Sequence, residues 1–177
     1  MKKPQPQLKP QYTAIVASSI DGRISLAKKR APDWTSREDW AFLQKSLSES
    51  DAVVVGRNTY QAAASRLRKR NTFVLSHRLH SVSRRGTVAF VNPENCELPK
   101  LLAGYRRVAI LGGAAVYRFM LENCLCDEIF VTIEPLVMGR GTTMFAGGTR
   151  TVRTRLLSVK RLNREGTLLL RYRVDQL

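Results

Sequence analysis

Three short stretches of the sequence place small or polar residues directly after an apolar run. Gly56-Arg57-Asn58-Thr59 follows "DAVVV", Ser76-His77-Arg78 follows "TFVL", and Gly112-Gly113 follows "RVAIL". A glycine between a strand and a helix lets a ligand come close to the backbone, and the free N–H groups of the helix start attract an anion. The Thr59 hydroxyl and the two arginines suit the same partner. Together the stretches indicate a dinucleotide site with phosphates spread along one sheet edge.

Other features of the sequence limit this interpretation. A glycine at a strand-to-helix turn is by itself more often a simple turn residue, so the argument depends on having three such places. The chain contains neither the G-x-G-x-x-G pattern of the usual Rossmann site nor the P-loop pattern. We therefore expect a dinucleotide site of a different kind.

Two aspartates are candidates for the reacting side of the site. Asp21 lies in the long loop after the first apolar run, where it is either the turn residue of an Asp-Gly pair or a substrate contact. Asp39 stands three residues after Ser36, which is the spacing of a helix N-cap and its reciprocal acid. Its other reading is a proton donor. The histidines, His77 and His80, lie in a basic loop, and we assign them no catalytic role.

The elements that would position these residues alternate along the chain. Apolar, β-branched runs predict strands at 12–18, 51–56, 72–76, 87–91, 107–111, 127–137, 153–162 and 167–174. Helical spacing and N-terminal signals predict helices at 35–50, 58–67, 100–105 and 114–124. This order predicts an α/β fold of three layers, with a mostly parallel central sheet and antiparallel C-terminal strands.

Length and composition are those of one globular domain. The 177 residues can bury a sizeable core, and we expect a single domain over residues 11–177 behind a disordered tail, 1–10, that holds three prolines. No apolar run is long enough to span a bilayer, and the N-terminus lacks the apolar core of a secretory signal. We expect a cytoplasmic protein with no membrane partner.

The charge of the chain is unusual. Lys and Arg number 30 against 14 Asp and Glu, a net charge of +16. Such a balance occurs in nucleic-acid binders, in proteins with phosphorylated ligands and on well-solvated surfaces. No zinc finger, aromatic RNA-binding signature or basic zipper accompanies the charge, so we do not expect a nucleic-acid partner. The three cysteines form no disulfide framework, and Cys124 and Cys126 have no histidines nearby, so no metal site is expected.

Seven stretches of the sequence also match a family pattern. They are "ASSIDGRIS", "WTSREDWAFL", "DAVVVGRNTY", "FVLSHR", "ILGGAAVY", "CDEIFVTIEPLVMGRGTTMF" and "TLLLRYRV", and they cover nearly all of the chain from Tyr12 to Val174. In order and spacing they resemble the reductase domain of bacterial riboflavin biosynthesis, which is the C-terminal part of a bifunctional deaminase–reductase. The chain resembles dihydrofolate reductase, of the same superfamily, more distantly. The resemblance implies a dihydrofolate reductase-like fold.

The resemblance also implies NADPH as the hydride donor. Gly56, Arg57 and Thr59 would contact the pyrophosphate and the adenosine side, while Ser76 and Arg78 would reach the 2′-phosphate. The stretch from Gly112 to Val116 would wrap the diphosphate and the nicotinamide ribose, and Trp34 and the Asp21 loop would close over the nicotinamide. The full set that the resemblance assigns to the cofactor is Ala17, Trp34, Gly56, Arg57, Thr59, Ser76, Arg78, Leu111, Gly112, Gly113, Ala114, Ala115, Val116 and Tyr117.

The substrate stays open between two heterocycles. The riboflavin enzymes reduce the ribose of 5-amino-6-(5-phosphoribosylamino)uracil, and "TSRED" and "LLLRYRV" resemble them. They usually carry an acid just before the glycine pair, where this chain has Leu111 in the manner of dihydrofolate reductase. Asp39 stands at about the right separation from Trp34 for the carboxylate with which that enzyme protonates its pterin, although its Leu-Pro pair is missing.

Three further expectations complete the sequence interpretation. Asp21 is the candidate for substrate contact and Asp39 for proton delivery. A protein that binds nucleotides or nucleic acid without turnover is the alternative outside the enzymes. The family resemblance further implies a homodimer formed through elements at the edge of the sheet.

Overall fold

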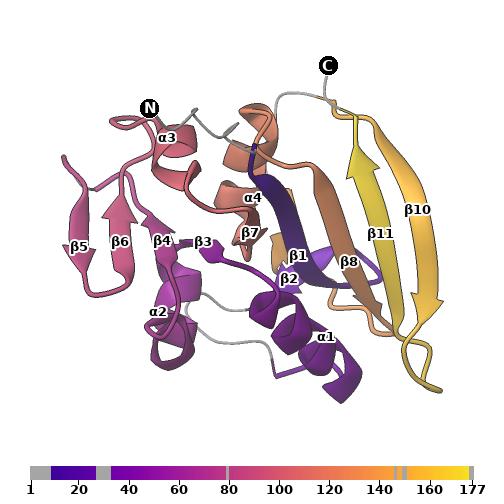
Figure 1. The fold of residues 1–177 in the computed structure, drawn as a ribbon. Coiled ribbons are helices and arrows are strands. Elements are labelled where there is room, and N and C mark those ends of the chain that lie inside the picture. Colours follow the sequence, from indigo (N-terminus) through magenta and orange to yellow (C-terminus); the bar gives the residue numbers. More distant parts are fainter. Residues whose placement is uncertain (1–8, 27–32, 79, 146, 149–150, 176–177) are drawn as a thin grey trace.

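The computed structural model describes residues 9–26, 33–78, 80–145, 147–148 and 151–175. Within these residues, nine strands form one sheet in the order β10-β11-β8-β1-β7-β3-β4-β6-β5 (Figure 1). Its strands are β1 (Gln11–Ser19), β3 (Ala52–Gly56), β4 (Thr72–Leu75), β5 (Ser83–Arg85), β6 (Val88–Val91), β7 (Arg107–Ile110), β8 (Glu128–Glu134), β10 (Thr154–Arg161) and β11 (Leu168–Val174). A small second sheet pairs β2 (Arg23–Ser25) with β9 (Thr142–Thr143).

The sheet is parallel in its centre and antiparallel at both edges. The strands from β8 through β1, β7, β3 and β4 to β6 are parallel neighbours. At one edge β11 and β10 run antiparallel, and at the other β5 does so. The expected mostly parallel sheet with antiparallel C-terminal strands is therefore confirmed. Six carboxyl ends of parallel strands meet along one edge, where ligands of such sheets bind.

Helices cover both faces of the sheet and complete three layers (Figure 1). Helices α1 (Arg37–Ser48) and α2 (Arg57–Leu67) bury Leu47 and Leu67 against one face. Helices α3 (Leu98–Leu102) and α4 (Ala114–Glu122) bury Leu102 and Met120 against the other. Strand β3 is buried from both sides, which explains why its Val53-Val54-Val55 run shows no polar alternation.

Three short strands were not predicted from the sequence. Strand β5 lies in the segment that we interpreted as a basic loop, and β2 and β9 lie in connections between larger elements. The residues of β5 are all exposed, so no apolar pattern indicates a strand, and only pairing with β6 creates it. Helix α3 begins at Leu98, with Pro99 in its first turn, two residues before the predicted start. Residues 1–8 of the expected tail, 1–10, lie outside the described residues.

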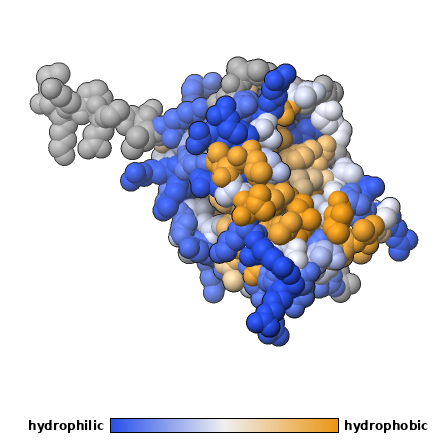
Figure 2. Space-filling view, turned by 90° about the vertical axis from the view of Figure 1, so that its right-hand side faces the viewer, coloured by the Kyte–Doolittle hydropathy of each residue, from blue (hydrophilic) through white to orange (hydrophobic). Residues whose placement is uncertain are grey.

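Strand β10 forms an apolar edge of the molecule. All eight of its residues are exposed, and Leu156, Leu157 and Val159 carry large apolar side chains there. Figure 2 shows hydrophobic surface gathered on this side of the molecule, bordered by hydrophilic residues. In the described part of the chain, no helix is both long and apolar enough to cross a membrane. The cytoplasmic location stays a prediction.

Candidate active site

Two of the three predicted phosphate-binding stretches meet at the carboxyl edge of the sheet. Strands β3 and β7 are parallel neighbours, and the backbone N–H of Gly56 donates a hydrogen bond to the Gly112 carbonyl over 2.6 Å. Strand β3 ends at Gly56, and Gly112-Gly113 follows the end of β7. The Gly112–Gly113 peptide bond is cis. The fold therefore brings together two glycine stretches that are far apart in the sequence.

A side chain is excluded at one of these glycines and crowded at another. Gly112 has a φ of +76°, in the left-handed region, and an added Cβ would lie 2.4 Å from Cε2 of Tyr117. An added Cβ at Gly56 would lie 3.1 Å from Cγ2 of Val116. Thr59 Oγ1 stands 3.9 Å from the corresponding position at Gly113. We call this arrangement of Gly56, Gly112, Gly113 and Thr59 the glycine cradle, since it leaves backbone and one hydroxyl for a ligand.

Two helices begin at the glycine cradle. Gly56 is the N-cap of α2 and Gly113 is the N-cap of α4, and neither residue has a side chain to cap the helix. The first N–H groups of a helix lack partners within the helix, and its N-terminus carries partial positive charge. Two such ends beside one another suit an anion that comes close to the backbone, as a diphosphate does.

An arginine-lined hollow of about 330 Å³ adjoins the cradle through Arg57. It is lined by Arg57, Tyr60, Gln61, Ser76, Arg78, Ser83, Arg85 and Phe90. The rings of Tyr60 and Phe90 meet edge to face with centroids 5.5 Å apart. Three of the predicted cofactor residues, Arg57, Ser76 and Arg78, thus lie together. Aromatic walls with three guanidinium groups suit a base or ribose that carries a phosphate.

The sequence interpretation missed part of this hollow. Ser83 and Arg85 come from β5, two residues apart and so on the same face of the strand. The sequence shows that Ser83 and Arg85 are two residues apart, but three exposed polar residues do not indicate a strand or the strand with which they pair. Arg84 points to the opposite face, where its guanidinium lies 6.0 Å from the ring centroid of Phe73.

The buried acid Asp39 lies at the start of α1. Its backbone N–H donates to Oγ of Ser36 over 3.2 Å, so the predicted N-cap is confirmed. Only 7% of its surface is exposed. Burial raises the pKa of the Asp39 carboxyl, and the nearby charge of Glu134 raises it further, whereas hydrogen bonds with Thr132 and Thr35 work against the shift. Asp39 is thus an acid that tends to keep its proton.

The hydrogen bond expected from the Ser36 backbone N–H to Asp39 is made to another residue. We expected Asp39 to return a hydrogen bond to the backbone N–H of Ser36, but the Oε1 atom of Glu134 accepts that bond over 2.7 Å. Glu134 is the last residue of β8 and pairs in register with Ser19 of β1. The sequence carries a signal for it, because Thr132 and Glu134 are polar residues two apart that follow the apolar run Ile129-Phe130-Val131 in this strand.

Asp21 fastens two loops together. Its carboxylate accepts hydrogen bonds from Ser19 Oγ over 2.6 Å and from the backbone N–H groups of Met138 and Gly139, each over 2.9 Å. The bonds from Ser19 and then from Met138 lower the pKa of Asp21 to about 2. The loop after β1 is therefore tied to the loop after β8. A contact between Asp21 and substrate stays a prediction.

The remaining predicted cofactor residues occupy both the core and the edge. Ala17 of β1 pairs with Thr132 of β8, and Trp34 is half-buried just before α1. The N–H of Leu111 donates to the Val54 carbonyl over 2.9 Å, and the Tyr117 hydroxyl donates to the Ile15 carbonyl over 2.7 Å. Leu111 and Tyr117 therefore hold strands in place. The first turn of α4 supplies Ala114, Ala115 and Val116.

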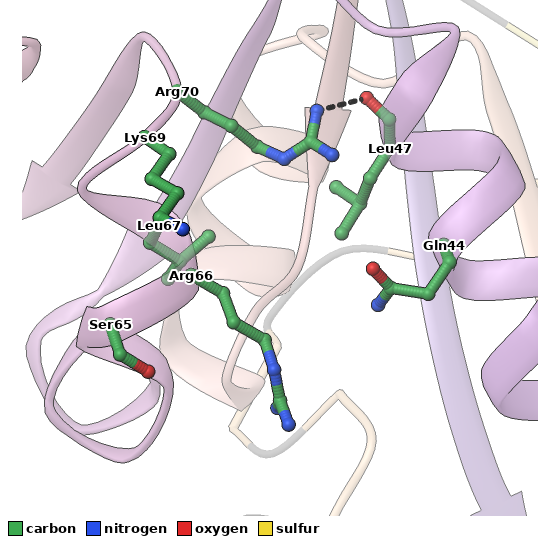
Figure 3. Close-up of a pocket in the computed structure, with 7 residues that line it drawn as sticks. All are labelled: Gln44, Leu47, Ser65, Arg66, Leu67, Lys69 and Arg70. Atoms are coloured by element: carbon green, nitrogen blue, oxygen red, sulfur yellow. Dashed lines mark hydrogen bonds between the residues drawn. The ribbon is translucent and has the colours of Figure 1, made fainter.

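A second hollow, of about 500 Å³, lies at the opposite ends of α1 and α2 (Figure 3). Arg70 donates from Nη1 to the carbonyl of Leu47 over 2.6 Å, beside Arg66 and Lys69. Helix C-termini carry partial negative charge, which cations stabilise. These side chains therefore complete two helix ends, and the hollow contains none of the predicted site residues.

Neither cysteines nor acids form a metal centre in the described residues. Cys96, Cys124 and Cys126 are free thiols. Searching those residues reveals no group of three or more His, Cys, Asp or Glu side chains that could hold a metal ion.

Comparison with known proteins places this site in a family. The sequence profile of the RibD C-terminal domain matches residues 10–168. The chain belongs to the RibD C-terminal domain family. The glycine cradle, the arginine-lined hollow and Asp39 all fall inside the matched region. No curated protein sequence matches this family member.

Solved structures share its fold at low sequence identity. A pyrimidine reductase-like protein from Corynebacterium diphtheriae is 18% identical, with a TM-score of 0.73, over 96% of this chain and 93% of its own. RibD from Acinetobacter baumannii is 22% identical, with a TM-score of 0.76, over 95% of this chain and 59% of its own. Dihydrofolate reductase from Enterococcus faecalis, complexed with NADP(H) and RAB-propyl, is 21% identical, with a TM-score of 0.66, over 96% of this chain and 99% of its own.

These likenesses confirm the expected dihydrofolate reductase-like fold. Together with the membership of the RibD C-terminal domain family, they support a reductase of the riboflavin-pathway type.

Proposed function

We propose that the protein is an NADPH-dependent reductase that transfers hydride to 5-amino-6-(5-phosphoribosylamino)uracil or a related pyrimidine. The observation that carries the proposal is the junction of the glycine cradle with the arginine-lined hollow, which meet at Gly56 and Arg57. A backbone cradle followed by a cationic, aromatic hollow matches a diphosphate followed by an adenosine with its 2′-phosphate.

The residues of the chain fit this cofactor. A side chain at Gly112 would collide with the Tyr117 ring and one at Gly56 would crowd Val116, so glycine lets the two segments approach each other closely. Helices α2 and α4 begin at these segments, and their N-termini favour a diphosphate there. Arg57, Arg78 and Arg85 line the hollow, and their guanidinium groups favour the 2′-phosphate that distinguishes NADPH from NADH. When bound, NADPH would supply a hydride from its nicotinamide ring.

The chain itself would supply the proton. Asp39 is buried at the start of α1, and Thr132 and Thr35 hydrogen-bond its carboxyl. In the ribosylaminouracil the C1′–O bond of the ribose ring first opens, with the nitrogen losing its proton and the ring oxygen gaining one, to give a C=N group. Reduction of that C=N group adds hydride to carbon and a proton to nitrogen, so C=N becomes CH–NH. In our proposal, Asp39 gives the proton, becomes a carboxylate and regains a proton from water. A raised pKa favours the protonated form of this acid, as proton delivery requires.

The activities named for the structurally similar proteins support this proposal. One is a pyrimidine reductase-like protein, one is RibD, and one is a dihydrofolate reductase with NADP(H). A further neighbour, from Thermotoga maritima, is a deaminase and 5-amino-6-(5-phosphoribosylamino)uracil reductase, of which this chain spans 57%. The activity proposed here is the reductase half alone.

Pterin reduction of the dihydrofolate reductase type is the second candidate. It is favoured by the buried acid Asp39 in the first helix and by the apolar Leu111 before the glycine pair. A side-by-side assay decides between the two: NADPH oxidation is followed at 340 nm with ribosylaminouracil phosphate and with dihydrofolate. Turnover of dihydrofolate alone would replace the first proposal by the second.

A binding test separates both reductases from a protein without turnover. We expect NADPH to bind with micromolar or tighter affinity, measured by the fluorescence of the nicotinamide. If no NADPH binds while nucleic acid does, the reductase proposals are wrong.

We also propose a homodimer through β10. This edge strand has unpaired backbone groups and three large exposed apolar residues, Leu156, Leu157 and Val159. An open apolar edge strand is a template for pairing with another chain. Two copies of β10 joined antiparallel would cover those backbone groups and shield the apolar surface seen in Figure 2.

A further inference from the structure

Glu134 is a buried carboxylate that the proposed reaction does not use. It ends β8 at the carboxyl edge of the sheet, beside Ser19 of β1, and only 3% of its surface is exposed. Acidic side chains are rarely this buried unless each oxygen has a partner. We therefore expect both oxygens of Glu134 to have hydrogen-bond partners.

Both oxygens of Glu134 are held by donors from different parts of the fold. Oε1 accepts the backbone N–H of Ser36, the N-cap of α1, over 2.7 Å. Oε2 accepts the hydroxyl of Thr167 over 2.7 Å. Each oxygen of this buried carboxyl group therefore has a hydrogen-bond donor, as burial of such a group requires. Glu134 thus fastens the start of α1 to the turn between β10 and β11.

The turn that Glu134 reaches is itself tightly bonded. Asn163 donates from Nδ2 to Thr167 Oγ1 over 2.9 Å, and its Oδ1 accepts the backbone N–H groups of Gly166 and Thr167. A chain of hydrogen bonds therefore runs from this turn through Thr167 and Glu134 to Ser36. It holds the first turn of α1, where Asp39 lies, from the side of the C-terminal hairpin.

The contact with Ser36 changes what Asp39 is free to do. In a capping box the acid of the first helical turn bonds to the N-cap N–H. Here Glu134 accepts that N–H, while Asp39 uses only its own N–H toward Ser36 Oγ. The Asp39 side chain is left to the hydroxyls of Thr132 and Thr35.

The groups that face Asp39 make Glu134 its main electrostatic neighbour. Asp39 faces Thr132 and Glu134 of β8 and Thr35 of the segment before α1. It also interacts electrostatically with Tyr117 of α4. Burial is the main cause of the raised pKa of Asp39, and the electrostatic influence of Glu134 adds to it. Two carboxyl groups in one buried site do not both ionise readily, so the second holds its proton more tightly.

We propose that Glu134 is the positioning residue for Asp39: it caps α1 in place of Asp39, leaves the Asp39 carboxyl available for proton delivery, and stands as a second acid beside it. This inference rests on the proposed function, in which Asp39 delivers the proton. It assigns Glu134 no contact with substrate or cofactor.

The first experiment measures Asp39 directly, without cofactor or substrate. Protein labelled with ¹³C at aspartate carboxyl groups is titrated by NMR, and Asp39→Asn identifies the signal. In Glu134→Gln the volume and one acceptor oxygen remain while the charge is lost. We expect the Asp39 midpoint to fall toward the ordinary aspartate value. An unchanged midpoint in a folded Glu134→Gln protein overturns the proposal.

Two further variants separate charge from structure. Glu134→Asp keeps the charge on a shorter side chain, so we expect the Asp39 midpoint to stay raised even where stability falls. Thr167→Val removes one hydrogen bond and no charge, so it should lower the melting temperature and leave the midpoint close to that of the natural protein. If Thr167→Val moves the midpoint as far as Glu134→Gln does, the role is structural and the proposal is wrong. These variants also serve if Glu134→Gln fails to fold.

Turnover provides the second readout. With whichever substrate is reduced, Glu134→Gln should lose about tenfold or more of kcat at pH 8, with less loss at pH 5, because Asp39 is active only when protonated. The Kd for NADPH should stay unchanged. If the natural protein reduces neither substrate, the proposed function fails by itself, and the NMR titration still decides the relation between Glu134 and Asp39.

Discussion

The N–H of Gly56 bonds to the carbonyl of Gly112 over 2.6 Å, and this contact joins the ends of β3 and β7. Each glycine precedes a helix, α2 or α4, so the bond sets two helix N-termini side by side. The cradle exists because the two chain segments approach closely at residues without side chains. Substitutions in and around this contact are therefore informative tests.

Gly112→Ala should damage both the fold and the cradle. Its φ of +76° is unfavourable for alanine, and the new methyl group would meet the Tyr117 ring at 2.4 Å. We expect a loss of about 2–5 kcal/mol in the free energy of unfolding, measured with urea, and weaker NADPH binding. Gly104→Ala is the control, because its methyl group meets no atom within 4 Å. Equal stability of both variants would contradict the geometry described for Gly112.

Removal of a guanidinium from the arginine-lined hollow should alter cofactor preference. We expect Arg78→Ala or Arg85→Ala to raise the Kd for NADPH about 10- to 100-fold, since a hydrogen bond to a charged group is lost, with little change for NADH. Fluorescence titration with both cofactors measures this. Arg66→Ala, in the other hollow, is the matched control. Equal losses for NADPH and NADH would place the 2′-phosphate elsewhere.

Asp39→Asn should lower turnover and spare stability. Loss of a general acid costs about 100- to 10,000-fold in kcat. Because the pKa of Asp39 is raised above 3.8 in the folded protein, its ionisation destabilises the fold progressively as pH rises from about 4 through the folded pKa. We therefore expect Asp39→Asn to gain stability relative to the natural protein as pH rises, measured by urea unfolding at pH 4 and pH 8. Glu49→Gln, on the surface, should show no such trend.

Asp21→Asn should show the opposite dependence on pH. The folded pKa of Asp21 is lowered from 3.8 to about 2, so its contribution to stability is fully present above about pH 4 and is lost as pH falls toward 2. The variant should melt at a lower temperature than the natural protein at pH 7, and the gap should narrow below pH 4. A gap that is constant over this range would show that the charge of Asp21 is not what ties the loops together.

Val159→Lys should break the proposed dimer. The residue is 55% exposed at the centre of β10, where a lysine would place a charge in the paired edge. Sedimentation should show a dimer for the natural protein and a monomer for the variant. Val137→Lys is the control, since Val137 is 69% exposed in the loop after β8. A monomeric natural protein would remove the dimer from the proposal.

Patterns local to the chain were enough for much of the framework. The uninterrupted Val53-Val54-Val55 run predicts a strand buried on both faces, and the Ser36–Asp39 spacing predicts the start of α1. Both are confirmed because hydrophobic periodicity and helix capping depend on residues within a few positions of one another. Strand β5 was not predicted from local patterns, because its exposed residues Ser83-Arg84-Arg85 form a strand only by pairing with β6.

In the site as well, local patterns predicted some features, while contacts between segments distant in the sequence form the others. Local sequence patterns predicted that Gly56 and Gly112-Gly113 lie between strands and helices, that arginines follow β3 and β4, and that an acid lies in the first turn of α1. The folded chain adds three contacts that no local pattern predicts: Gly56 bonds to Gly112, Arg85 joins Arg57 and Arg78, and Glu134 rather than Asp39 accepts the N–H of Ser36. The physical reason is that hydrogen bonding and burial depend on which strands become neighbours, and the order of strands in the sheet differs from their order in the chain.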